Sequence, residues 1–137
     1  MKIIQKYDKE IIKDIVKNCG SKNVKSTYSY LDVANYHSKG KFRCEIIDEC
    51  AFFAGLLGKQ HFRLIETAVK QDCQGKGYGT AIIVRMKKLC KENNLNKITL
   101  RTSKDETALE FFKKQGGIIT GEKGNDYEME IKVWVMK

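Results

Sequence analysis

Proline is absent from this 137-residue chain, and long apolar runs are absent as well. Because no Pro-rich linker divides the sequence, its length predicts a single domain over residues 1–137. The apolar run that contains the predicted central strand, Cys50 to Leu57, is far too short to span a membrane. The N-terminal stretch turns polar after two isoleucines, so we expect no signal peptide and a cytoplasmic protein.

Cysteine and histidine are both scarce. The five cysteines are Cys19, Cys44, Cys50, Cys73 and Cys90, no Cys-x-x-Cys pair occurs, and there are two histidines. This set forms no structural zinc pattern, and we expect no metal. We expect reduced thiols, with Cys44, Cys50 and Cys90 as small apolar core residues. Cys73 precedes a predicted helix start, which lowers a thiol's pKa, so an acetyl-cysteine relay is a minor alternative.

Acidic residues are outnumbered: 26 Lys and Arg against 17 Asp and Glu give a net charge of +9. Such a surplus attracts anions, such as a phosphorylated cofactor, nucleic acid or an acidic surface. The lysines are spread along the chain, and the sequence has neither a recognition helix nor an aromatic-basic stripe. We therefore expect no specific nucleic-acid partner and rank a basic nucleic-acid-binding module last.

Hydrophobic periodicity predicts strands and helices of ordinary length. In chain order we expect a short strand in residues 1–7, a helix from Lys9 to Asn18 capped by Asp8, a short helix near Leu31 to Tyr36, strands from Phe42 to Ile47, Ala51 to Leu57 and Phe62 to Val69, a helix from Gly77 to Lys91, a strand from Lys97 to Thr102, a helix that begins at a capping box (Ser103 to Glu106) and ends at Gly116, and strands from Ile118 to Lys123 and Asp126 to Val135. The central strand–helix–strand order implies one parallel crossover in an otherwise mostly antiparallel sheet.

Three glycines, Gly75, Gly77 and Gly79, fall within five positions where a strand gives way to a helix. A helix N-terminus presents four unpaired N–H groups and a partial positive charge. Glycines before it allow a phosphate to approach the backbone closely. The N–H groups from Gly75 to Thr80, with the charge of Lys76 nearby, therefore predict an anion site.

Other glycine-rich phosphate loops fit this stretch poorly. The Walker pattern is absent. A Rossmann fingerprint requires glycine where Thr80 stands and an acidic residue about 20 positions further on, where none occurs. A kinase loop would need a His-Arg-Asp sequence later in the chain. A tight turn without a ligand stays open as an alternative.

The hexapeptide Gln74–Gly79 resembles the Gln/Arg-x-x-Gly-x-Gly/Ala motif of the GNAT superfamily of acetyl-CoA-dependent N-acetyltransferases. Its context agrees, with the strand LIETAV before it, the helix TAIIVRMKKLC after it, and ITLRTSKDETALEFFKKQGG resembling the next strand, helix and glycine stop. The resemblance covers about residues 41 to 135. It implies the α/β (α+β) GNAT fold: a mixed, mostly antiparallel sheet of about seven strands, a parallel splayed pair at its centre, and helices on both faces.

The resemblance also implies acetyl-CoA as acyl donor. Its pyrophosphate would lie on the N–H groups from Gln74 to Thr80, and its pantetheine arm would run along the preceding strand. The N–H group of Thr67 or Val69 would polarise the thioester carbonyl. The cofactor-binding residues implied are Thr67, Ala68, Val69, Gln74, Gly75, Lys76, Gly77, Tyr78, Gly79, Thr80, Phe112 and Lys113, with Lys76 and Lys113 as candidates for the 3′-phosphate.

The implied reaction is direct attack of a primary amine on the thioester in a ternary complex. Glu66 and Glu45 are the candidate bases, either of them through a water. Many relatives have a tyrosine acid where this chain has Phe112, which cannot donate a proton. Tyr127 is a candidate substitute, and Tyr36 and Tyr30 are further ones. An acid is also dispensable, because a thiol of pKa ~8.5 is a fair leaving group.

We therefore predict an N-acetyltransferase acting on a small-molecule or peptide amine. In this fold the acceptor pocket is expected in residues 21–40 and the last hairpin, and the sequence does not name the amine. A homodimer stays open. The alternative function is a non-catalytic acyl-CoA-binding domain of the same fold, in which Phe112 marks the loss of the acid.

Overall fold

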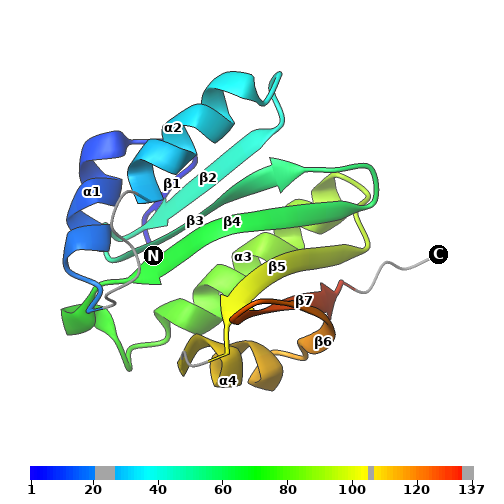
Figure 1. Cartoon of the computed structure of the whole chain (residues 1–137). Coiled ribbons are helices and arrows are strands. Elements are labelled where there is room, and N and C mark those ends of the chain that lie inside the picture. Colours follow the sequence, from blue (N-terminus) through cyan, green and yellow to red (C-terminus); the bar gives the residue numbers. More distant parts are fainter. Residues whose placement is uncertain (21–26, 105–106, 134–137) are drawn as a thin grey trace. The chain divides into compact units, whose positions relative to one another are not determined.

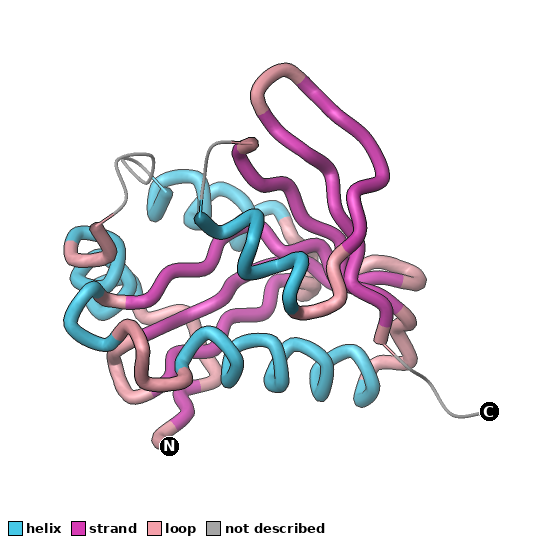
Figure 2. The backbone as a smooth tube through the Cα atoms, turned by 90° about the horizontal axis from the view of Figure 1, so that it is seen from below, coloured by secondary structure: helices cyan, strands magenta, loops and turns pink. Residues whose placement is uncertain are grey.

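The computed structural model describes residues 1–20, 27–104 and 107–133. Helices and strands follow one another along the described chain in the expected order (Figures 1 and 2). The elements are β1 (Ile3–Ile4), α1 (Lys9–Lys17), α2 (Thr27–His37), β2 (Phe42–Ile47), β3 (Ala51–Leu57), β4 (His61–Val69), the 3-10 helix η1 (Gln71–Cys73), α3 (Tyr78–Glu92), β5 (Lys97–Ser103), α4 (Thr107–Lys114), β6 (Ile118–Lys123) and β7 (Asp126–Lys132).

The strands of the described residues form one seven-stranded sheet in the order β1-β2-β3-β4-β5-β7-β6. The β1–β2, β2–β3, β5–β7 and β6–β7 pairs are antiparallel. The β4–β5 pair is parallel, as a strand–helix–strand crossover requires. The prediction of a mixed, mostly antiparallel sheet of about seven strands with one central parallel pair is confirmed.

Two compact units make up the described chain. The first consists of Met1–Leu57 and Ile65–Ile82, and the second of Gly58–Leu64 and Ile83–Lys137. Strand β4 and helix α3 each contribute residues to both units. The single domain over 1–137 stays a prediction.

The core of the first unit is built where α1 and α2 pack on β2 and β3. Asp8 caps α1 by accepting a hydrogen bond from the Ile11 amide (3.2 Å), and the apolar stripe of α1 is buried. Cys44 and Ile46 of β2 belong to this helix-covered cluster. Glu45 and Ile47 alternate with them on the opposite face and are buried as well. Strand β2 is therefore covered on both faces.

In the second unit, β7 pairs with β5 on one side and with β6 on the other. Helix α4 turns its apolar residues Leu109 and Phe112 inward. It ends where the Gly117 amide donates to the Phe112 carbonyl (2.8 Å) and Gly116 adopts φ of 91°. That is the left-handed conformation that favours glycine at a helix end.

Most predicted element bounds are confirmed to within one residue. The β2, β3 and β6 strands have the predicted ends, and α2 is longer than expected, beginning at Thr27. Strand β7 ends at Lys132, so Val133, which was predicted to continue it, is not in the strand. The second half of the predicted capping box (105–106), residues 134–135 of the last predicted strand, and positions 21–26 of the predicted acceptor region lie outside the described residues. Among the described residues, no helix has both the length and the apolar character that crossing a membrane requires.

Candidate functional site

The glycine loop, which we define as Gln74–Gly77, joins η1 to α3 in the first unit. Gly75 and Gly77 have φ of 77° and 90°, a conformation that residues with a Cβ rarely adopt. A Cβ added at either position would meet no protein atom within 4 Å. The glycines are therefore required by the backbone path and not by protein packing, and they leave open space beside the loop.

Helix α3 begins directly after this loop. Its first intrahelical hydrogen bond runs from the Ala81 amide to the Gly77 carbonyl at 3.0 Å. The amides of Gly77, Tyr78, Gly79 and Thr80 therefore precede the regular hydrogen-bond ladder of the helix. They carry the positive end of the helix dipole, which favours an anion. Lys76, exposed between the two glycines, adds a full positive charge.

Gln74 links the start of the loop to the neighbouring backbone. Its side-chain Nε2 donates to the carbonyl of Val69 at the end of β4 (3.4 Å) and to that of Cys19 after α1 (3.3 Å). The side chain thus bridges two elements of the first unit, so this predicted cofactor residue has a structural role in holding the loop.

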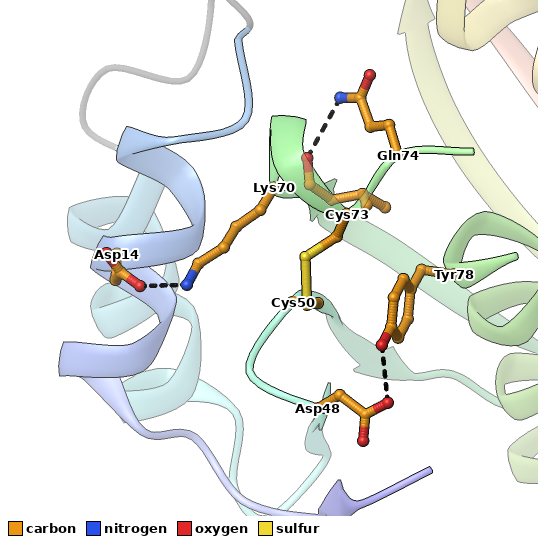
Figure 3. The surroundings of a disulfide bond; sticks show 8 residues. Asp14, Asp48, Cys50, Lys70, Cys73, Gln74 and Tyr78 are labelled. Carbon is orange, nitrogen blue, oxygen red and sulfur yellow. Dashed lines mark hydrogen bonds and ion pairs between the residues drawn. A yellow bond between two sulfur atoms is a disulfide. The ribbon is translucent and has the colours of Figure 1, made fainter. Parts of the chain in front are cut away.

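Tyr78, the first residue of α3, is hydrogen-bonded to the turn between β2 and β3. Its hydroxyl donates to Asp48 Oδ2 at 2.8 Å (Figure 3). Asp48 Oδ1 accepts from the Lys2 amide at 2.6 Å. The Lys2 amide, and then the Tyr78 hydroxyl, lower the pKa of Asp48. The hydrogen bond to Asp48 raises the pKa of Tyr78. Sequence reasoning missed this pair, because Asp48 reads as an ordinary turn residue.

Cys50 and Cys73 form a disulfide, so the prediction of reduced thiols is wrong for these two residues (Figure 3). Cys50 is half-buried in the turn before β3 and is not a core thiol. The Lys70 amide donates to the Cys50 carbonyl (2.8 Å), and η1 then turns the chain back until the two Cα atoms lie 6.0 Å apart. Cys73 has no thiol to act as an acetyl relay in this form. The burial expected for Cys44 and Cys90 is confirmed.

Strand β4 carries the predicted pantetheine residues and one candidate base. Glu66 is half-buried, and its Oε1 accepts a hydrogen bond from the Thr67 amide at 3.1 Å. Of the two amides predicted to polarise the thioester, that of Thr67 is therefore already engaged. The half-buried Ile65 and Ala68 both pack on the α1–α2 cluster, although their spacing of three departs from strand alternation.

The parallel register of β4 with β5 covers three residue pairs, from His61 with Lys97 to Arg63 with Thr99. Strand β4 then continues to Val69 and β5 to Ser103. The splaying of the two strands beyond these pairs stays a prediction.

Glu45, the other candidate base, lies on β2 of the first unit and is only 4% exposed. Gln5 Nε2 donates to its Oε2 at 3.1 Å. Glu45 is a buried, hydrogen-bonded carboxylate and not a surface one, so water reaches Glu66 more readily.

Three predicted site residues belong to the second unit. Phe112 is buried in the core of that unit, with its ring 5.4 Å from the Phe111 ring in an edge arrangement. Lys113 is exposed on α4 and faces Glu110 at 3.7 Å. Tyr127 is half-buried on β7, and Lys104 Nζ lies 5.1 Å from the centre of its ring, at cation–π distance.

The other tyrosines considered as acids lie on α2 and are strongly exposed. Tyr30 is 66% exposed and Tyr36 is 84% exposed, with the Tyr36 ring against that of His37.

Among the described residues, no group of three or more His, Cys, Asp or Glu side chains is arranged to hold a metal ion. Lys70 is paired with Asp14 at 2.6 Å in the first unit (Figure 3).

The model of one protein family matches most of this chain. The model of the acetyltransferase (GNAT) family matches residues 18–117, more than half of the chain. This chain therefore belongs to the acetyltransferase (GNAT) family. A comparison of the sequence with curated proteins finds no match.

Solved structures share the fold. The PaiA N-acetyltransferase of Thermoplasma acidophilum, solved in complex with coenzyme A, has a TM-score of 0.76 at 17% identity, over 96% of this chain and 99% of that one. An aminoglycoside 6′-N-acetyltransferase complexed with coenzyme A gives 0.78 at 15% identity, over 100% and 99%. The ribosomal-protein-S18-alanine N-acetyltransferase of Escherichia coli gives 0.75 at 14% identity, over 99% and 95%. At these identities the similarity shows the fold.

Proposed function

We propose that this chain is an N-acetyltransferase that moves the acetyl group of acetyl-CoA to a primary amine, by direct attack in a ternary complex. The observation that carries the proposal is the glycine loop. Gly75 and Gly77 hold left-handed backbone beside open space, directly before the N-terminus of α3. This arrangement lies within the region that matches the family.

The residues of the first unit fit the phosphate groups of acetyl-CoA. The amides from Gly77 to Thr80 supply hydrogen-bond donors and the positive end of a helix dipole. Lys76 supplies an exposed positive charge at the loop. With a net charge of +9, the whole chain attracts this anionic donor. When bound, acetyl-CoA supplies the activated acyl group, and the chain supplies the base and the hydrogen-bond donors.

Glu66 is the base that we favour. It is half-buried, and its Oε1 already accepts a hydrogen bond from the Thr67 amide. In that position it can take a proton from the substrate ammonium, through a water, so that the free amine attacks the thioester. The Val69 amide is the proposed donor to the thioester carbonyl, because the Thr67 amide is engaged. Glu66→Gln should lower kcat by about 100-fold or more and leave acetyl-CoA affinity within about twofold.

Tyr127 is the candidate acid, but an acid is not required for a thiolate leaving group of pKa ~8.5. Tyr127→Phe therefore tests whether Tyr127 or water protonates the departing thiolate. A loss of kcat without a change in acetyl-CoA affinity would indicate proton donation by Tyr127. Unchanged kcat would leave the protonation of coenzyme A to water.

Binding at the loop is tested by a matched pair of glycine variants. Gly40 has φ of 83°, close to the 90° of Gly77, and a Cβ at either position would lie in open space. Both alanine variants thus carry similar backbone strain, roughly 1–2 kcal/mol. We expect Gly77→Ala to weaken acetyl-CoA binding at least about tenfold, because its methyl occupies the phosphate approach, and Gly40→Ala to bind normally. Equal affinities in the two variants would overturn the site assignment.

Transfer itself is tested by chromatographic measurement of free coenzyme A with a panel of amines. Polyamines, aminoglycosides and peptides with free N-termini sample the small-molecule and peptide acceptors. Amine-dependent release of coenzyme A that Glu66→Gln abolishes supports the enzyme. Tight acetyl-CoA binding without release for any amine favours the alternative, a non-catalytic acyl-CoA-binding domain.

A further inference from the structure

One short segment contacts both ends of the glycine loop. This segment is the β2–β3 turn, Asp48–Cys50, which lies between the last residue of β2 and the first of β3. Cys50 is bonded to Cys73, the residue directly before the loop. Asp48 accepts a hydrogen bond from Tyr78, the residue directly after it, at 2.8 Å. All of these residues belong to the first unit. Figure 3 shows them around the disulfide.

Backbone hydrogen bonds at both of its ends fix the conformation of the turn. Asp48 and Glu49 have φ of 52° and 55°, and the Cys50 amide closes the turn on the Ile47 carbonyl at 2.9 Å. The Asp48 amide is also bonded to the Lys2 carbonyl at 2.8 Å, which ties the turn to the start of β1. The turn is therefore a fixed point to which the loop is attached.

Within the loop, by contrast, the side-chain hydrogen bonds of Gln74 hold only its first residue. All four residues from Gln74 to Gly77 are exposed, and two of them are glycines. Glycine has the widest choice of backbone conformations, so a glycine loop is ordered mainly by what holds its ends. Loss of one attachment would let the loop amides sample other directions.

We propose that Cys50 and Cys73 are a thiol–disulfide exchange site that sets the affinity of this chain for acetyl-CoA. The disulfide holds the glycine loop in the conformation that binds the donor, and the dithiol form binds more weakly. The physical reason is preorganisation, since a loop that is ordered only on binding loses conformational entropy at that moment. The inference rests on the function proposed above.

The exchange reaction needs only a small thiol or disulfide. A dithiol reagent attacks the sulfur of Cys50, which is half-buried, whereas Cys73 is only 8% exposed. The S–S bond breaks, and Cys73 leaves as a thiolate and takes up a proton. The second thiol of the reagent then displaces Cys50 as a thiol and closes the reagent's own disulfide. Two electrons pass to the protein, and oxidised glutathione reverses the reaction, leaving as two molecules of reduced glutathione.

The test compares one protein in two redox states. Wild-type protein is prepared with oxidised glutathione or with dithiothreitol, and the thiols are counted by alkylation after denaturation. We expect three in the oxidised form, because Cys19, Cys44 and Cys90 are free, and all five in the reduced form. Calorimetric titration should then give an acetyl-CoA Kd about tenfold higher for the reduced form, and reoxidation should restore the original value.

Two variants separate the exchange site from general effects of the reagents. Cys50→Ser should bind acetyl-CoA like the reduced form under both conditions. Cys90→Ala keeps the Cys50–Cys73 bond, so it should follow the wild type in both. Thermal unfolding of each sample shows whether it is folded. If Cys50→Ser does not fold, the comparison of the two wild-type forms still decides.

Each remaining outcome has a distinct meaning. A disulfide that only stabilised the fold would raise the unfolding temperature and leave Kd unchanged, which would overturn this inference and leave the proposed function standing. Five alkylated thiols in the oxidised sample would overturn it as well. Absence of acetyl-CoA binding in both folded forms would instead reject the proposed function, and the inference with it.

Discussion

At the scale of single residues, Gly117 occupies a position where the surrounding atoms leave no room for a side chain. A Cβ at this position would lie 2.7 Å from the Phe112 carbonyl oxygen and 2.9 Å from the Met129 side chain. The backbone contact cannot be relieved by a rotamer change. Gly117→Ala should therefore lower the free energy of unfolding by about 2 kcal/mol or more, measured by chemical denaturation.

Gly121 provides the control for this prediction. It lies on β6, and the nearest atom to an added Cβ there is the Glu128 Cβ at an ordinary 3.9 Å. Gly121→Ala should change the free energy of unfolding by roughly 0.5 kcal/mol or less. If both variants lost the same stability, the close approach at Gly117 would not be the cause.

The free cysteines offer a second test at this scale. Burial, and then the charge of Glu45, raises the pKa of Cys44 to about 12. Burial raises the pKa of Cys90 to about 11. Since only the thiolate reacts, neither residue should be alkylated by iodoacetamide in the native protein at about pH 8, and both should react after denaturation. Native labelling of either residue, read by peptide mass, would contradict the burial described here.

At the scale of elements, the hydrogen bond between Asp48 and Tyr78 joins the β2–β3 turn to α3. The pKa of Asp48 is lowered, so its contribution to stability is present above the ordinary aspartate pKa of about 3.9 and is lost as the pH falls through the lowered value. Asp48→Asn should therefore be less stable than the wild type at neutral pH, and the difference should shrink below about pH 4. Urea unfolding across this range measures it.

Glu49→Gln is the matched control, because it removes a carboxylate from the same turn but leaves the Asp48–Tyr78 pair in place. A pH dependence of equal size in this variant would assign the effect to the net charge of the turn and would contradict a specific role for Asp48.

The same elements show what a sequence reveals and what it hides. Strands β2 and β3 were predicted to the residue, because their apolar runs end at polar turn residues. The glycine loop was predicted because glycine spacing and a following helix are local signals. The Cys50–Cys73 bond was not, since it depends on how β3 and β4 lie side by side in the sheet. An antiparallel pairing places the residue before one strand near the end of the next, which is the signal that could have found it.

At the scale of the whole molecule, charge should govern how the donor is captured. The chain carries a net charge of +9, and acetyl-CoA is an anion. Raising the salt from about 50 mM to about 500 mM shortens the Debye length from roughly 14 Å to roughly 4 Å, so we expect acetyl-CoA binding to weaken several-fold. Lys76→Ala should show a smaller dependence on salt than the wild type. Affinity that does not change with salt would contradict an electrostatic contribution to binding.

Family membership and the glycine loop both support the proposal that this chain binds acetyl-CoA at the N-terminus of α3. The most direct test is calorimetric titration of the folded, oxidised wild-type protein with acetyl-CoA at moderate salt. We predict one site per chain with a roughly micromolar Kd. No detectable binding at about millimolar acetyl-CoA, in a sample that unfolds cooperatively on heating, would contradict it.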